Sequence, residues 1–125
     1  MTKIQSLISG LPAYLLFFFA PLTPLVVTVI FLVFTDLLTG IKAAKKQGEQ
    51  IRSRKLFKTL EKALIHFTLI LLSRLMELYI IPGIPVVNLL GGFIAIYEFK
   101  SILENYKIIT GIDLIKFFHE KIKRY

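Results

Sequence analysis

Apolar residues in this chain occur in long uninterrupted runs. No charged residue lies between Lys3 and Asp36, and none lies between Glu77 and Glu98. Uncharged, mostly apolar runs of about 18 or more residues are typical of helices that cross a bilayer. The pattern therefore predicts an all-α integral membrane protein.

The first run is too long for a single span and contains Pro21-Leu22-Thr23-Pro24 near its middle. Two prolines three positions apart remove backbone donors and restrict the residues before them, so a helix is expected to end at Ala20. This predicts helices over residues 4–20 and 24–45. The first helix is short, and a location in the membrane interface is the alternative to a span.

A second proline turn, Pro82-Gly83-Ile84-Pro85, separates helices predicted over residues 60–81 and 86–106. The third helix contains five ionisable residues, but its centre over 67–73 is uncharged. The sequence thus predicts two transmembrane helical hairpins. They belong to one membrane domain over residues 1–125, with a basic linker over 42–62 and an amphipathic tail over 111–125.

Composition supports this class and excludes others. The chain has 125 residues, of which 55% are apolar, and a mean hydropathy of +0.70. Four spans of about 20 residues each leave no room for a separate catalytic domain, so an enzyme is not expected. Cysteine is absent, and His66 alone does not supply the three or four ligands of a zinc site. No metal or cofactor is expected.

Charge predicts the orientation. Both proline turns are uncharged, whereas the linker is strongly basic, so the positive-inside rule places the linker and both termini in the cytoplasm. Three spans with an interfacial first helix is the alternative. Because spans flank the linker and Phe57 is the one aromatic residue in it, anionic lipid is the expected partner rather than nucleic acid. The predicted lipid-facing residues are Lys42, Lys45, Lys46, Arg52, Arg54, Lys58 and Lys62.

Three ionisable residues are predicted at a similar depth. With a rise of about 1.5 Å per helical residue, Asp36 lies about 18 Å from its outer turn, Glu98 about 19 to 20 Å and His66 about 22 Å. An ionisable side chain inside a membrane indicates a functional site by default, because leaving it unpaired is costly. The alternative is a layer low in the inner leaflet that anchors packing and topology, where Lys42, Lys62 and Lys100 can extend to it and pair with it.

Arg74 and Glu77 lie three positions apart on the third helix, so they share a face. They are expected either to pair with each other or to line a polar lumen against another copy. Small residues such as Gly91 and Gly92 permit close helix contacts, and self-association is expected. In the tail, Ile115 and other apolar residues recur at helical spacing, with basic residues between them. This pattern indicates an amphipathic helix at the inner membrane surface.

Several segments resemble the phage holin family related to the toxin-secretion and phage-lysis holins. The similarity lies in Asp36-Leu-Leu-Thr39-Gly40, in Ser53-x-Lys55, and in Glu98-x-x-Ser101-Ile-Leu-Glu104-Asn105. It implies a small inner-membrane protein that assembles with copies of itself and opens lesions, through which a cell-wall hydrolase leaves the cytoplasm. In that reading the family motif residues are Asp36, Thr39, Gly40, Ser53, Lys55, Glu98, Ser101, Glu104 and Asn105, and none is catalytic.

The main hypothesis is therefore a holin-like protein of the bacterial inner membrane that self-associates and forms pores or lesions. Asp36, His66, Arg74, Glu77 and Glu98 are its candidate oligomer or pore residues. One alternative is a closed membrane scaffold that recruits a cytoplasmic partner. A second is a small ion or proton channel subunit that uses Asp36, His66 and Glu98.

Overall fold

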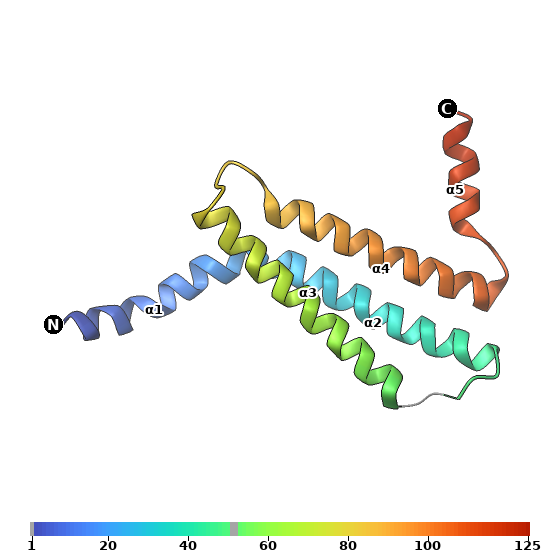
Figure 1. The fold of residues 1–125 in the computed structure, drawn as a ribbon, viewed down its shortest axis with the longest axis horizontal. Helices are drawn as coiled ribbons and strands as arrows, with labels where there is room; N and C mark the ends of the chain where they lie inside the picture. Colours follow the sequence, from blue (N-terminus) through green and yellow to red (C-terminus); the bar gives the residue numbers. More distant parts are fainter. Residues whose placement is uncertain (1, 51–52) are drawn as a thin grey trace.

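The computed structural model describes residues 2–50 and 53–125, and these residues form helices and connections without strands. Figure 1 shows the helices in sequence order. They are α1 (Lys3–Phe19), the short 3₁₀ helix η1 (Ala20–Leu22), α2 (Thr23–Lys46), α3 (Ser53–Tyr79), α4 (Val86–Thr110) and α5 (Leu114–Lys123).

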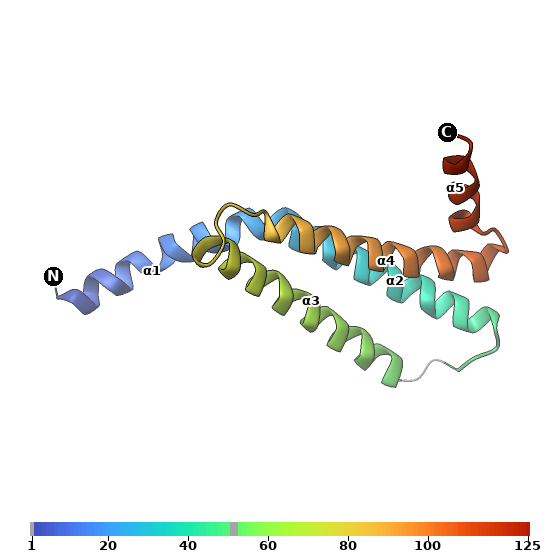
Figure 2. The same cartoon turned by 45° about the horizontal axis from the view of Figure 1, so that its top comes forward.

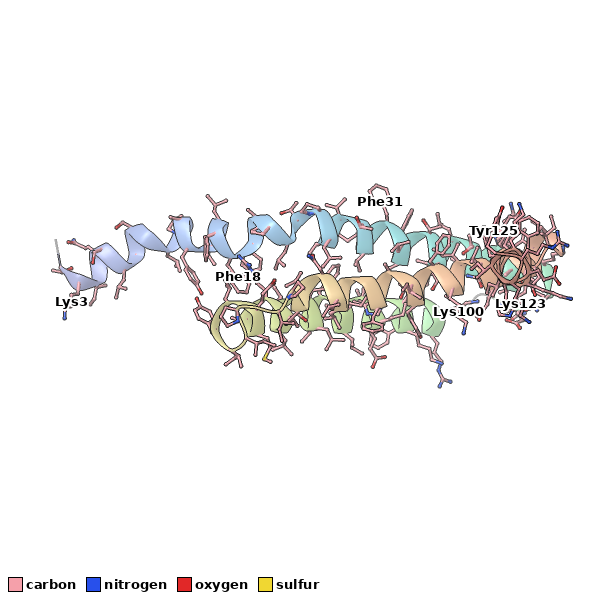
Figure 3. All side chains as sticks on the ribbon, turned by 90° about the horizontal axis from the view of Figure 1, so that it is seen from above. Lys3, Phe18, Phe31, Lys100, Lys123 and Tyr125 are labelled. Carbon is pink, nitrogen blue, oxygen red and sulfur yellow. The ribbon has the colours of Figure 1, made fainter. Side chains whose placement is uncertain are left out.

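Helices α2, α3 and α4 form a bundle. Helices α2 and α4 lie side by side and run in the same direction, while α3, which connects them in the sequence, runs in the opposite direction on one side of this pair (Figures 1 and 2). Leu22, Val29 and Ile70 are among the buried residues of its apolar core. Large apolar side chains also cover the outside: Phe31, which is 67% exposed, points away from the bundle (Figure 3). A bundle that is apolar on its outer surface suits lipid rather than water.

Helix α1 differs from the sequence prediction. The chain does not reverse at Pro21–Pro24, so the predicted first hairpin is absent from the structure; α1, η1 and α2 form one rod over Lys3–Lys46 that projects beyond the bundle (Figures 1 and 3). Apart from Phe18, which is buried in the core cluster, the described side chains of α1 are exposed.

The prolines are compatible with this rod because each lies in the first turn of a new helical segment. The N–H of a first-turn residue has no hydrogen-bond acceptor within its own helix, so proline destabilises the helix little at that position. The flanking Ala20 and Thr23 keep right-handed helical dihedrals. The two prolines therefore produce a single 3₁₀ turn instead of a reversal.

Within residues 2–50 and 53–125, two helical segments are long and apolar enough to cross a membrane, Lys3–Lys46 and Val86–Thr110. Helix α3 is not among them, because charged residues lie near both of its ends. At about 1.5 Å per residue, the 44-residue rod is about 66 Å long, which is more than twice the hydrocarbon thickness of about 30 Å.

The other boundaries differ from the predictions mainly where helices extend into the basic linker. Helix α2 continues to Lys46 and α3 already begins at Ser53, so the basic residues of 42–62 lie mostly on helix ends. Helix α4 ends at Thr110 and is capped by Gly111, whose φ of 79° places it in the left-handed region that favours glycine. The turn there directs α5 across the axis of α4 (Figures 1 and 2).

Candidate functional site: a buried charged cluster

Four ionisable residues meet near the middle of the three-helix bundle. Asp36 comes from α2, Lys62 and His66 come from α3, and Glu98 comes from α4. Lys62 and His66 are four positions apart, which places them on one face of α3. Glu98 is fully buried, with 0% of its surface exposed, and His66 is also buried. We refer to these four residues as the charged cluster.

Lys62 is the centre of the charged cluster. Its Nζ lies 2.7 Å from Oδ2 of Asp36 and 3.1 Å from Oε2 of Glu98, so one ammonium donates to carboxylates from two other helices. Its side chain is 25% exposed, whereas that of Asp36 is only 11% exposed. Lys62 thus joins α3 to α2 and α4 at a single point.

His66 completes the coordination of Glu98. Its Nε2 lies 2.8 Å from Oε1 of Glu98, so both carboxylate oxygens of Glu98 have a partner. A carboxylate only accepts hydrogen bonds, so Nε2 of His66 carries the proton when Glu98 is ionised. With His66 neutral, two carboxylates and one ammonium leave one net negative charge; with His66 protonated, the charged cluster is neutral.

Further hydrogen bonds extend from the charged cluster toward the helix ends near the linker. The Asn105 side-chain amide donates to Oδ1 of Asp36 at 3.0 Å and to Oγ1 of Thr39 at 3.0 Å. One step further, Nζ of Lys55 donates to the carbonyl oxygen of Gly40 at 3.2 Å. No buried side-chain nitrogen or oxygen among the described residues lacks a partner. A satisfied polar network of this kind fixes the relative positions of the helices.

The arrangement holds charge inside an apolar bundle. Burying an unpaired ion is strongly unfavourable, and removing one member of a buried pair leaves its partner uncompensated. Among the described residues no group of three or more side chains could hold a metal ion. What the charged cluster provides is the pairing of buried charges from three helices.

Arg74 and Glu77 lie outside the charged cluster, toward the proline end of the bundle. Arg74 donates to the carbonyl oxygens of Phe17 at 3.1 Å and Phe18 at 3.3 Å, and its guanidinium lies 5.5 Å from the Phe17 ring centroid. Pro21 has no N–H to bond the Phe17 carbonyl, so Arg74 satisfies a group that the proline leaves free. No ion pair joins Arg74 to Glu77 in the described part of the chain.

The remaining motif residues occupy varied positions. Ser53 begins α3, Ser101 is half-buried, and Glu104 is exposed. Of the predicted lipid-facing residues, Lys62 lies instead in the charged cluster, and Nζ of Lys46 donates to the carbonyl oxygen of Ile109 at 2.6 Å. The others that the structure describes are exposed, and Arg52 lies outside the described residues; the exposed ones are Lys42, Lys45, Arg54 and Lys58.

The distances along the helices predicted that Asp36, His66 and Glu98 lie at a similar depth, and the structure brings them into one cluster. Lys42, Lys62 and Lys100 were the lysines expected to extend to this layer, and in the structure Lys62 is the one that joins the three helices. The available signal was its spacing of four from His66, which places a cation on the face that carries the histidine. The contact of Asn105 with Asp36 has no comparable signal, since it depends on α2 and α4 lying side by side.

The family model described as the bacteriophage holin family matches residues 13–125. No curated protein and no solved structure matches the chain.

Proposed function

Because the chain belongs to the bacteriophage holin family, we propose that it self-associates in the bacterial inner membrane and permeabilises it. The opening would let a cell-wall hydrolase leave the cytoplasm. In this proposal the protein does no covalent chemistry and needs no cofactor. Its action consists of assembly and rearrangement of helices in lipid.

The charged cluster carries this proposal. The bundle has apolar side chains on its outer surface and buries ion pairs at its centre, with Glu98 fully enclosed. Such a distribution is stable in a single bundle and also provides polar groups that can face water when helices separate and reassemble around a lumen. The pairing between α2, α3 and α4 is the contact that such a rearrangement has to break.

Self-association is supported by apolar surface that the single chain leaves uncovered. The exposed α1 carries large side chains along its whole length, including Leu7, Leu11 and Phe17. A cavity of about 350 Å³ between α2 and α3 is lined almost wholly by apolar side chains, among them Val33 and Phe67. Contiguous apolar surface of this kind marks contacts with lipid or with other protein.

The orientation proposed is the one that the positive-inside rule predicts, with the linker and the C-terminus in the cytoplasm. The uncharged stretch from Ile4 to Thr35 would be about 48 Å long as a straight helix, so it exceeds the hydrocarbon thickness. The structure shows this rod as continuous, so an N-terminus in the cytoplasm requires the rod to bend at Pro21–Pro24 in the bilayer and to return Lys3 to the cytoplasmic side.

The location of the N-terminus can be tested with Thr2→Cys, because the chain has no other cysteine. We expect this cysteine to resist a membrane-impermeant maleimide added to intact spheroplasts and to react after lysis. Labelling in intact spheroplasts would mean that α1 stays extended on the outer side. Ile84→Cys in the uncharged outer turn is the matched positive control for outside labelling.

The proposed activity is tested by titrated expression in bacterial cells, with membrane potential and retention of a cytoplasmic reporter protein followed together. We expect abrupt depolarisation with loss of the reporter. Asp36→Ala removes one carboxylate from Lys62 and frees the Asn105 amide, so permeabilisation should begin earlier at equal membrane levels. Glu120→Ala, an exposed carboxylate outside the charged cluster, should leave the timing unchanged.

Other outcomes separate the alternative functions. Depolarisation with the reporter retained would indicate an ion-sized channel that uses the charged cluster. Intact potential despite confirmed insertion would indicate a closed scaffold. Identical timing in wild type and Asp36→Ala would reject a role for the charged cluster in opening.

A further inference from the structure

The inner corner between α4 and α5 forms a pocket that the proposed function does not use. It has a volume of about 470 Å³, within the range of about 300–1,000 Å³ that is typical of small-molecule sites. Charged residues from both helices line it: Glu104 and Lys107 from α4, Asp113 at the start of α5, and Lys116 on α5. His119 also lines it, so the pocket presents side chains of both signs.

Two of these charges neutralise each other. Nζ of Lys107 lies 3.3 Å from Oδ2 of Asp113, and Oδ1 of Asp113 accepts the backbone N–H of Lys116 at 3.0 Å. The Lys116 N–H and, after it, the Lys107 ammonium hold the pKa of Asp113 below its usual range, so the pair is charged at neutral pH. Asp113 is thereby committed to capping α5 and to fixing the corner.

The remaining charges are left without a partner. Glu104 and Lys116 take part in no ion pair within the described residues, although both line the same pocket. A purely anionic ligand would meet the Glu104 carboxylate, and a purely cationic one would meet Lys116. A ligand that carries one charge of each sign satisfies both groups.

The position of the pocket indicates the source of such a ligand. Helix α5 runs across the axis of α4 at the end of the bundle where the basic linker also lies (Figures 1 and 2). Its apolar residues Ile115, Phe118 and Ile122 recur at helical spacing and are exposed, as expected of a helix in the membrane interface. Ile115 belongs to this apolar face and also lines the pocket, so the pocket adjoins the acyl-chain region.

We propose that the α4–α5 corner binds the headgroup of a zwitterionic phospholipid of the inner leaflet, namely phosphatidylethanolamine. Lys116 and His119 contact the phosphate, Glu104 accepts hydrogen bonds from the ammonium, and Leu103 and Ile115 contact the first part of the acyl chains. The site goes beyond the proposed function, because it concerns how α5 is held on the membrane and does not require permeabilisation.

Native mass spectrometry of the full chain, released from detergent that contains equal amounts of phosphatidylethanolamine and phosphatidylglycerol, measures the preference directly. We expect wild type to retain phosphatidylethanolamine over phosphatidylglycerol. Glu104→Gln should lower that ratio about threefold, the size of one exposed ion pair. Glu120→Gln makes the same change of charge on α5 outside the pocket and should leave the ratio unchanged.

Lys116→Ala should lower retention of phosphatidylethanolamine, whereas Lys123→Ala, outside the pocket, should not. Equal retention of the two lipids by wild type, or equal ratios in Glu104→Gln and Glu120→Gln, would overturn the proposal. A preference for phosphatidylglycerol would also overturn the proposal, because it would mean that the basic tail attracts anionic lipid through its net charge alone. Displacement of the lipid by an equal concentration of soluble phosphoethanolamine would overturn the claim that the ligand of this pocket is a membrane lipid. None of these readouts depends on whether the protein permeabilises cells.

Discussion

Lys62→Met is expected to destabilise the bundle by about 3–5 kcal/mol, the cost of removing one partner from a buried ion pair. The substitution keeps the length of the side chain but leaves Asp36 and Glu98 facing each other without the ammonium that lies 2.7 and 3.1 Å from them. Unfolding of the purified protein in mixed micelles, followed by circular dichroism during titration with a denaturing detergent, measures the loss.

Lys58→Met is the matched control, because Lys58 lies one turn earlier on α3 and is exposed. Its effect should stay within about 0.5 kcal/mol. Adding Asp36→Asn and Glu98→Gln to Lys62→Met removes the uncompensated charges and should recover part of the loss. Equal midpoints for Lys62→Met and Lys58→Met would show that Lys62 does not hold the three helices together.

Gly91→Leu is expected to separate α2 from α4 and to cost about 1–3 kcal/mol by overpacking. Gly91 is buried, and a Cβ at this position would lie 2.7 Å from Cδ1 and 2.9 Å from Cδ2 of Leu25. The Leu25 side chain can move away from a single methyl group, but the longer leucine has no free space between the two helices. The same detergent titration measures the effect.

The adjacent glycine provides the control. A Cβ at Gly92 would have nothing within 4 Å, and Gly92 is exposed. Gly92→Leu should be neutral or stabilising by up to about 1 kcal/mol, since glycine is a poor helix former. Leu25→Ala should partly restore Gly91→Leu. If Gly91→Leu and Gly92→Leu have the same midpoint, the close approach of α2 to α4 does not contribute to stability.

Lys62→Met and Gly91→Leu affect two different contacts of the same three-helix bundle. Gly91 lies near the start of α4, where the Leu25 side chain of α2 packs against it, and Glu98 lies two turns further along the same helix. Opening of the bundle in lipid would have to break both contacts. Variants that weaken them without preventing insertion should therefore permeabilise earlier than wild type.

Several properties follow from the sequence alone. Long runs without charge, such as the one from Ile4 to Thr35, predict membrane helices because an α-helix satisfies its own backbone hydrogen bonds in lipid. The fixed rise per residue placed Asp36, His66 and Glu98 at a similar depth before any packing was known. The bacteriophage holin family was also suggested by short motifs, and the family match confirms it.

Tertiary structure decided what local patterns leave open. Prolines in a first turn permit both a bend and a continuous helix, and the contacts of Phe18 and Arg74 accompany the continuous rod. Lys62 is one basic residue among many in the sequence, and only the packing of three helices brings its ammonium between two carboxylates. The depth of a residue in the membrane is set by its distance along its own helix. The side chains that it contacts depend on how the helices rotate and pack against one another, and this is a property of the assembled bundle.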